Sequence, residues 1–577
     1  SRGLGDVYKR QFVSLLLTIR VVYAQSEEKS AVKAQKDLDW YNCSFEADHV
    51  YGAAINKAYQ FLKNKKGKSK PIVALIGGGI DWEHEALKNN IWTNPKEKPD
   101  GKDNDRNGYV DDLHGWNFLG AADGQVMEKL MVEGDREFLR LKDKYGSYFF
   151  DGKNYFKYVN GKRVSLDPPA DMDEYKYYQH IVMPSSRLCS EYGSLLFANV
   201  LREYVQIFDK QMRDRNPGKT SFTVEDIVAC VDKNSPRDSL RDIALYLMAW
   251  SMNEKRGDDK AWEGTYNYYF GDKAEKRMKE SYERVLKENG TDLRKEIVGD
   301  NYMDINDRIY GNNILLTLNS EVNTMVAGII AGRRGIEGRN SPIAENAQIM
   351  NLVVSAESGE PYLKDMALAI RYAVDHQVDI ILLGEQNTVY PREQKQWMIE
   401  AIRYAESKGV LVVVPTWDLS FDVSQLVFYP NRWMDGGKDL TNLLVVASSD
   451  KAGNPSIASN YGIQGIDLFA PGVEIFAPNV GDTYKSASGP CLAAATVAGI
   501  AALIKTYYPQ LTGNQIRDVL LKTVSSRKGV EVQKNCRING RMSEDLFLFE
   551  QLCQSGGIVN AYQALVEAEK IAKKNKK

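Results

Sequence analysis

Carboxylate and amide side chains gather in one short stretch of the chain, where their spacing suits a calcium ion. In DGKDNDRNGYVDD, Asp103, Asp105 and Asn107 stand at alternate positions before Gly108. Ca²⁺ is bound by oxygens spaced in this way around a glycine turn, with a backbone carbonyl among them. The pattern predicts a structural calcium site whose ligands are Asp103, Asp105, Asn107, the Tyr109 carbonyl, Asp111 and Asp112.

The same stretch can also be interpreted without a metal. His114 stands where an EF-hand loop has a Glu that supplies two ligands, so any site here would be a shorter variant. Asp and Asn side chains also stabilise turns by accepting hydrogen bonds from nearby backbone amides. The sequence favours calcium over a metal-free turn, and both interpretations stay open.

Cysteines and histidines are few. The chain has six cysteines and five histidines, at positions 49, 84, 114, 180 and 376. No CxxC pair and no histidine cluster is present, so a zinc site is not expected. The spacing of Cys536 and Cys553 would allow a local disulfide, which sequence alone does not decide.

The elements that would position these groups alternate between strands and helices. Short apolar runs at 71–80, 347–354, 379–384, 409–415 and 442–448 have the composition of buried strands. Amphipathic helical patterns at 362–377 and 392–409 lie between them. Near-continuous apolar strands separated by helices are typical of a mainly parallel sheet that is covered on both faces. The sequence therefore predicts a doubly wound α/β fold.

The domain organisation follows from changes in composition. Residues 70–120 and 301–568 carry the α/β pattern, whereas 121–300 are rich in Lys, Glu, Asp and Tyr and predict a mainly helical insertion. Residues 25–69 lead into the core, and 569–577 form a basic tail. The net charge of −2 provides no long-range attraction to nucleic acid or an anionic membrane.

The N-terminal 24 residues predict export. Residues 1–11 fit no targeting signal and are interpreted as an artefactual start. The apolar run that follows ends at small Ala24 before a polar stretch, as a secretory signal peptide does. We therefore expect a periplasmic or extracellular protein, with no membrane-spanning segment in the mature chain.

Three segments, in order, resemble the signature blocks of the subtilisin-like serine peptidases (subtilases). VALIGGGIDWEHEALKNNIW resembles the block of the catalytic Asp, VNTMVAGIIAG the His block His-Gly-Thr-His-Val-Ala-Gly, and SGPCLAAATVAGIAALI the Ser block Gly-Thr-Ser-Met-Ala-Ala-Pro. The resemblance covers roughly residues 40–568. It implies a subtilisin-like sheet and, by descent, a serine-type endopeptidase active in proteolysis.

Every residue that the resemblance would make catalytic is replaced. The Asp position is Gly77, the His position is Val322, and the Ser position is Cys491. The second His of its motif is Met325, and the Asn expected to stabilise an oxyanion is Asp418. Val322 cannot accept a proton and Gly77 has no side chain, so a nucleophile would have no base. An ionised Asp418 would oppose the negative charge that develops during acyl transfer.

Cys491 allows two interpretations. The resemblance implies a position at a helix N-terminus, where the helix dipole would lower the pKa of a thiol. The favoured alternative is a small buried apolar side chain or a disulfide partner. His84 has a counterpart in the family outside the catalytic set, so a structural role is expected for it.

The expected function is therefore binding rather than catalysis. Gly384, Glu385 and Gln386 replace the Ser-Phe-Gly that borders the substrate in the family, and peptides pair with such an edge through main-chain hydrogen bonds. The leading hypothesis is an exported pseudoenzyme that binds a peptide or a protein partner. The alternatives are a serine-type endopeptidase with a non-standard site and a product without a selected role.

Overall fold

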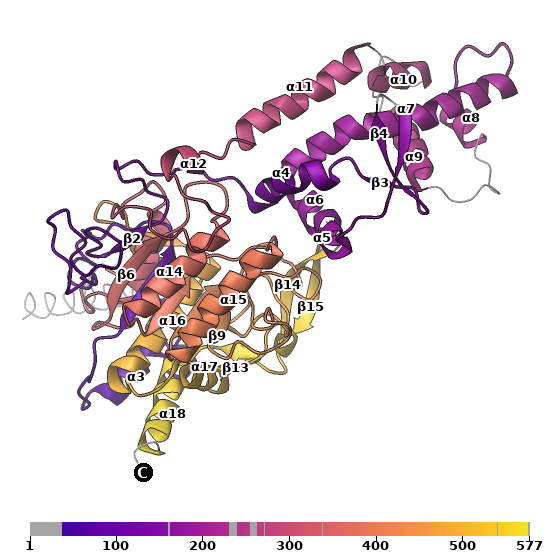
Figure 1. Cartoon of the computed structure of the whole chain (residues 1–577). Coiled ribbons are helices and arrows are strands. Elements are labelled where there is room, and N and C mark those ends of the chain that lie inside the picture. The colour runs from indigo at the N-terminus through magenta and orange to yellow at the C-terminus, as the bar shows by residue number, and fades with distance from the viewer. Residues whose placement is uncertain are drawn as a thin grey trace, which may run out of the picture. The chain divides into compact units, whose positions relative to one another are not determined.

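A computed structural model describes residues 37–159, 162–229, 239–253, 262–270, 272–336, 339–538 and 541–574 (Figure 1). The expected signal peptide and Cys230 lie outside these ranges. The chain divides into two compact units: unit 1 is the chain up to Lys129 together with Arg294 onward, and unit 2 is Leu130–Leu293. The boundaries predicted at 121 and 300 differ by several residues from those of these units and stay a prediction of domain organisation.

Unit 1 is built on a nine-stranded sheet in the order β13-β16-β10-β9-β8-β7-β1-β6-β2. Its central strands are parallel and coincide with the five predicted apolar runs: β1 (Ile72–Gly77), β6 (Gln348–Val353), β7 (Ile380–Leu383), β8 (Leu411–Pro415) and β9 (Leu443–Ser449). Parallel strands β2 (Gly115–Asn117), β10 (Leu468–Pro471) and β16 (Gly557–Ile558) extend it, and β13 (Ser525–Ser526) pairs antiparallel at one edge. The predicted α/β class is confirmed.

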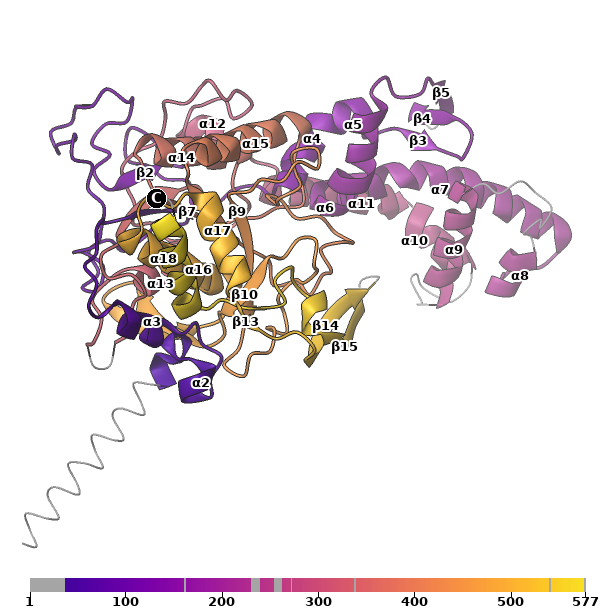
Figure 2. The same ribbon diagram turned by 90° about the horizontal axis from the view of Figure 1, so that it is seen from below.

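Helices cover both faces of this sheet (Figure 2). On one face lie α14 (Leu363–Asp375) and α15 (Arg392–Ser407), whose apolar side chains pack with sheet residues in the main core. On the other lie α13 (Glu321–Ile330), α16 (Pro490–Tyr507), α17 (Gly513–Lys522) and α18 (Ala561–Lys574). Burial on two faces explains why β8, LVVVP, is apolar at every position instead of alternating.

Shorter elements complete unit 1. They are η1 (Trp40–Asn42), α2 (Phe45–Asp48), α3 (Ile55–Leu62), α12 (Arg294–Ile297), η3 (Phe549–Gln551), and the hairpins β11 (Ile475–Asn479)–β12 (Thr483–Ala487) and β14 (Glu531–Ile538)–β15 (Arg541–Leu548). Cys536 and Cys553 are buried free thiols, so the disulfide that their spacing would allow is not formed.

One described helix, α16, is long and apolar enough to cross a membrane, but 83% of it is buried inside the fold. A helix that is apolar on all sides is expected in the core of a large domain. Its first turn carries Cys491, and its body packs against β8, β9 and β10. The buried helix α16 therefore fixes the position of Cys491, which is one residue of the candidate site.

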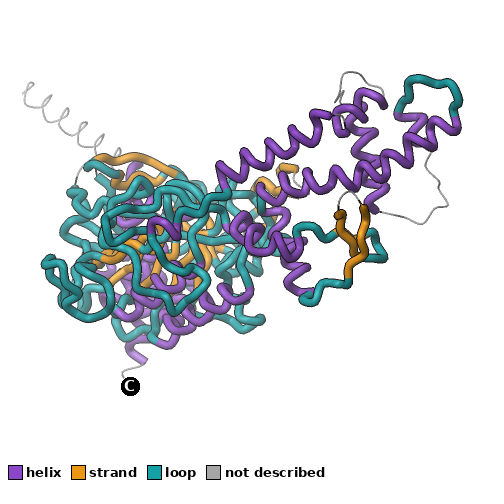
Figure 3. The backbone as a smooth tube through the Cα atoms, turned by 45° about the horizontal axis from the view of Figure 1, so that its top comes forward, coloured by secondary structure: helices purple, strands orange, loops and turns teal. Residues whose placement is uncertain are grey.

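Unit 2 is mainly helical (Figure 3). Its helices are α4 (Glu133–Tyr145), α5 (Met172–Tyr177), the π-helical η2 (Tyr178–Val182), α6 (Met183–Ser185), α7 (Arg187–Arg215), α8 (Val224–Ala229), α9 (Ser239–Asn253), α10 (Trp262–Phe270) and α11 (Asp272–Asn289). The sequence did not predict its three-stranded antiparallel sheet of β3 (Phe149–Phe150), β4 (Tyr155–Val159) and β5 (Lys162–Leu166). These strands are short, and their pattern was too brief to separate from loops.

Candidate functional site

The positions that the resemblance would make catalytic lie at the carboxyl ends of neighbouring strands and in the first turns of two helices. Gly77 ends β1, Glu385 follows β7, and Asp418 follows β8, which are three adjacent strands of the sheet. Val322 and Cys491 are the second residues of α13 and α16, which pack against each other. Ligand sites of doubly wound sheets form at such strand ends.

Asn323 fills the space beside the Gly77 position. A Cβ atom built on Gly77 would lie 3.4 Å from both the amide nitrogen and the oxygen of the Asn323 side chain. Asn323 Nδ2 donates to the Gly78 carbonyl oxygen at 2.7 Å and contacts Asn351 Oδ1 at 3.4 Å. Asn323, which stands where the His block has Gly, therefore packs in van der Waals contact beside position 77.

The glycine that follows is required by the backbone. A Cβ on Gly78 would lie only 2.1 Å from the carbonyl oxygen of Asn319, so a larger residue could not occupy this turn without moving the loop before α13. The turn thus keeps its shape although the catalytic side chain before it is gone.

Val322 offers an apolar surface in place of a base. Its side chain is 44% exposed in the first turn of α13. The carboxylate of the neighbouring Glu321 forms an ion pair with Lys485 on β12. Met325, in place of the second His of the block, is buried. None of these side chains is placed to take a proton from Cys491.

The surroundings of the partly exposed Cys491 favour a neutral thiol. Its Sγ lies 4.0 Å from the Gly384 carbonyl oxygen. Burial, together with the carboxylates of Glu385 and Asp418, raises the pKa of Cys491 to about 12. Loss of water and the two nearby acids therefore oppose the effect of the helix N-terminus, and they support the favoured interpretation of Cys491 as a neutral thiol. A reactive thiolate is not supported.

Glu385 is an acid of the site whose pKa is raised by its surroundings. Ser355 Oγ donates to Glu385 Oε1 at 2.5 Å. Burial and the nearby Glu360 raise the pKa of Glu385 to about 7, and the Ser355 hydrogen bond only partly offsets them. The carboxyl group therefore changes charge near neutral pH, beside the segment Gly384–Gln386.

This segment leaves backbone groups available. The Gly384 amide donates to the Ile76 carbonyl oxygen, and Asn387 exchanges two backbone hydrogen bonds with Tyr429. Between them, the amides and carbonyls of Glu385 and Gln386 form no backbone hydrogen bond with another described residue. The Gln386 side chain is held by the Pro430 carbonyl at 3.0 Å. A short segment without backbone pairing thus lies between two fixed points, with Glu385 partly exposed and Gln386 buried.

Asp418 is accompanied by a buried lysine that the sequence did not indicate. The surrounding protein raises the pKa of Asp418, and the Lys534 ammonium opposes that shift. Lys534 is 1% exposed, and burial lowers its pKa to about 8. Its ammonium donates to the carbonyls of Ile457 and Asn535. An acid and an amine thus lie where a neutral amide would stabilise an oxyanion.

The histidines do not replace the missing base. His84 is 1% exposed, its Nδ1 accepts from the Ala86 amide at 3.0 Å, and its Nε2 lies 3.2 Å from the Thr483 carbonyl oxygen. Both ring nitrogens are engaged, which agrees with the structural role expected for this residue. No histidine forms a hydrogen bond with Cys491 in the part of the chain that the structure describes.

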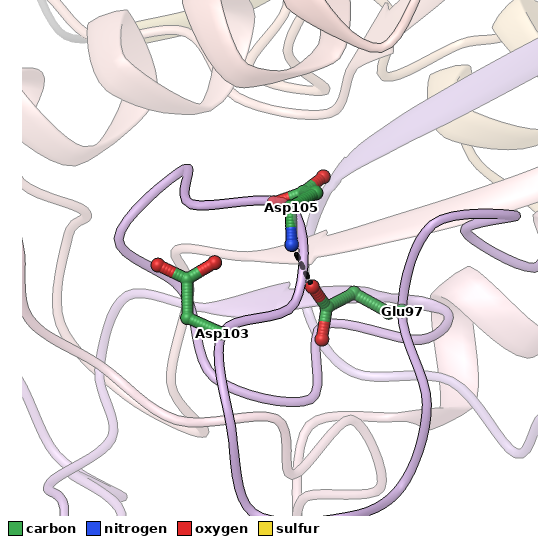
Figure 4. Close-up of side chains that lie close together, drawn as sticks. All are labelled: Glu97, Asp103 and Asp105. Carbon is green, nitrogen blue, oxygen red and sulfur yellow. Dashed lines mark hydrogen bonds between the residues drawn. The ribbon is translucent and has the colours of Figure 1, made fainter.

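The predicted calcium ligands are only partly brought together. Asp112 is buried and accepts from the side chains of Asn94, Asn107 and Tyr372. Asp111 accepts from the backbone amides of residues 100 and 101. Asp103 and Asp105 do approach each other, and Glu97, which the sequence analysis did not include, joins them (Figure 4). The turn interpretation therefore accounts for Asp111 and Asp112, and a smaller carboxylate cluster remains.

Sequence reasoning missed the supporting residues for different reasons. Asn323 could have been found, because it occupies a glycine position of the His block. Glu97 precedes the acidic loop by only six positions, but no spacing rule includes it. Ser355 and Lys534 carry no local signal, since their roles depend on contacts with segments that are distant in sequence.

Comparisons with known proteins agree with this fold. The model of the Subtilase family matches residues 309–540, a span that contains Val322, Gly384–Gln386, Asp418 and Cys491 but not Gly77. Subtilisin Savinase of Lederbergia lenta is 30% identical over 205 residues, which are 35% of this chain and 70% of that protein. The chain belongs to the subtilase family.

Other relatives are matched over less of their length. The thermostable alkaline protease of Halalkalibacterium halodurans is 30% identical over 202 residues, or 35% of this chain and 52% of the relative. The chain thus spans about half the length of that relative. The solved structure of the prenylagaramide maturation protease PagA is 22% identical, with 43% of this chain and 82% of that chain covered and a TM-score of 0.34.

Proposed function

We propose that this chain is an exported, non-catalytic subtilase that binds extended peptide segments of a partner protein at the edge formed by Glu385 and Gln386. The observation that carries the proposal is the state of Cys491: two acids and burial raise its pKa to about 12. The export signal expected before residue 25 supports the location.

Acyl transfer at this site would lack three requirements. A nucleophile must lose its proton to a base, and Val322 provides none. The base must be oriented by an acid, and Gly77 has no side chain. The oxyanion requires donors, whereas Asp418 presents a carboxyl group that repels negative charge when ionised. Each loss alone would lower the rate, and the three together remove the base, its orienting acid and the neutral oxyanion donor of the family's mechanism.

Peptide binding has different requirements, which the site keeps. An extended segment pairs with free backbone amides and carbonyls at a strand edge, whatever its side chains. The backbone of the partly exposed Glu385 and of Gln386 behind it is unpaired among the described residues, and their neighbours on both sides are fixed by backbone hydrogen bonds. The exposed Val322 side chain adds apolar contact area in the position of the catalytic base. Binding without cleavage is therefore the function that the geometry supports best.

The first test is a pair of assays on the mature protein. Unfolded casein and a fluorophosphonate probe report catalysis, and fluorescence polarisation with a library of labelled peptides reports binding. We expect no cleavage, no labelling and saturable binding of at least one group of peptides. Substitution of Gln386→Pro removes an amide donor at the edge and should abolish binding, whereas Gln386→Ala keeps that amide and should retain most of it.

Two results would contradict the proposal. Peptide affinity that is equal in the Pro and Ala variants would place the binding elsewhere. Cleavage that disappears in Cys491→Ala would favour the alternative, a serine-type endopeptidase descendant with a non-standard site, and would point to Glu385 or Asp418, the acids near Cys491, as the proton acceptor.

A further inference from the structure

A cavity of about 290 Å³ lies within unit 2, outside the segment that matches the Subtilase family. It is bordered by the end of α4, by β3, α5, η2 and α6, and by the first turns of α7 (Figure 1). Seven of its thirteen lining residues are tyrosine or phenylalanine, and none of the thirteen is an aspartate, glutamate, lysine, arginine or histidine. Sites for small ligands are mostly apolar cavities of about 300–1,000 Å³, so this cavity has room for a ligand the size of one ring.

Tyrosines that pack on one another form the floor of the cavity. Tyr145, Tyr175 and Tyr178 are buried, and the ring centroid of Tyr145 lies 5.3 Å from that of Tyr175 and 5.8 Å from that of Tyr178. Aromatic rings at these distances attract one another, which fixes their orientation before a ligand arrives. Phe150 and Met183 also line the cavity but are exposed, so they form its entrance from solvent.

The charged side chains next to the cavity disfavour a charged ligand. Lys142 Nζ lies 5.1 Å from the ring centroid of Tyr192, and Lys144 Nζ lies 4.9 Å from that of Tyr145. Two rings that could attract a cationic ligand are therefore already in contact with a cation. Glu174 accepts from the Tyr145 hydroxyl and forms an ion pair with Lys144, so it is also engaged. Because no basic residue lines the cavity, an anion would have no counter-charge, and the ligand should be neutral.

Two tyrosine hydroxyl groups are available to such a ligand. Tyr148 and Tyr192 are half-buried, and neither hydroxyl forms a hydrogen bond with another described residue. A purely apolar ligand would remove water from these hydroxyls without replacing its hydrogen bonds, which costs free energy. A ligand that has an apolar face and hydroxyl groups around its edge satisfies both the rings and the hydroxyls.

We infer that this cavity binds one neutral sugar ring. The C–H groups of a pyranose form an apolar face that packs on tyrosine and phenylalanine rings. Its hydroxyl groups can donate to, and accept from, the hydroxyls of Tyr148 and Tyr192. The contacts lie within unit 2 and do not involve Glu385 or Gln386, so sugar binding is an activity separate from peptide binding in unit 1.

The test measures sugar binding to the full mature chain by calorimetry and by saturation-transfer-difference NMR, which also detects weak complexes. The probes are glucose, galactose, N-acetylglucosamine, maltose and cellobiose, and we expect saturable binding of at least one of them. Tyr148→Phe and Tyr192→Phe each remove one hydroxyl and keep the ring. Each should weaken binding about two- to tenfold, which is the worth of one neutral hydrogen bond. Both variants should melt like the wild-type protein, because neither hydroxyl has a partner among the described residues.

A matched control and two further probes separate this inference from its alternatives. Tyr246→Phe removes an exposed tyrosine hydroxyl on α9 outside the cavity lining and should leave sugar affinity unchanged. N-acetylphenylalanine amide represents an apolar ligand, and tetramethylammonium represents a cation. Saturable binding of either probe without binding of any sugar would overturn the inference. Sugar affinity that is unchanged in both Tyr148→Phe and Tyr192→Phe would place the sugar elsewhere, and absence of sugar binding by a protein that melts cooperatively would also refute it.

Discussion

The Glu385 carboxyl group should make stability fall as pH rises through neutrality. Its pKa is raised from 4.5 to about 7 in the folded protein. The folded state therefore holds this proton more tightly than the unfolded state, and the free energy of unfolding decreases between about pH 4.5 and pH 7. A shift of 2.5 pKa units corresponds to about 3.4 kcal/mol, and partial exposure reduces this to about 1–3 kcal/mol.

Glu385→Gln removes the titrating group but keeps an oxygen that can accept from Ser355. Urea unfolding followed by tryptophan fluorescence at pH 5 and pH 8 measures the effect. At pH 5 the variant and the wild-type protein should be nearly equal, because the wild-type carboxyl group is protonated. At pH 8 the variant should be the more stable by about 1–3 kcal/mol.

The control is Glu357→Gln, which removes an exposed carboxylate two residues after Ser355. Its effect should stay within about 0.5 kcal/mol at both pH values. A Glu385→Gln difference that is the same at pH 5 and pH 8 would refute the reasoning, because it would mean that Glu385 does not titrate between them.

Three further outcomes are expected. Gly77→Asp should destabilise the protein by about 2–3 kcal/mol in urea unfolding, because the new carboxylate would meet the Asn323 side chain. Adding Asn323→Gly should recover at least about 1 kcal/mol, and strictly additive effects would contradict a contact between the two positions. Arg294→Met should cost about 3–5 kcal/mol, because Asp365 would lose a paired guanidinium that is 1% exposed, and a neutral result in thermal melts would contradict a buried pair. Alkylation of Cys491 by iodoacetamide at pH 8, followed by mass spectrometry, should be at least about a hundredfold slower than for free cysteine, and equal rates would show that its pKa is not raised.

The sheet could be predicted because its signal is local. Each central strand, such as β6 within 347–354, is an apolar run without charge. A strand with this composition is stable in a sheet that is covered on both faces, so the run predicts a central strand. The strands of unit 2 gave no comparable signal: β4, YFKYV, mixes aromatic residues with lysine in a region of helical composition. Local pattern was therefore sufficient for the core and insufficient for the three-stranded sheet.

The candidate site was predictable in position but not in chemistry. Motif alignment located Gly77, Val322 and Cys491 correctly on strand and helix ends. It could not reveal the direction of the Cys491 pKa, because that depends on Glu385 and Asp418, which come from other strands. In the acidic loop, spacing likewise could not indicate Glu97, which lies outside the pattern, or the hydrogen bond that Tyr372, far along the chain, donates to Asp112.

The contact between position 77 and Asn323 has a consequence for redesign of this chain. An aspartate at position 77 would bring a carboxylate against the Asn323 amide, which is held by its hydrogen bond to the Gly78 carbonyl. Positions 77 and 323 therefore form one packing unit, and a change at either one should be accompanied by a change at the other.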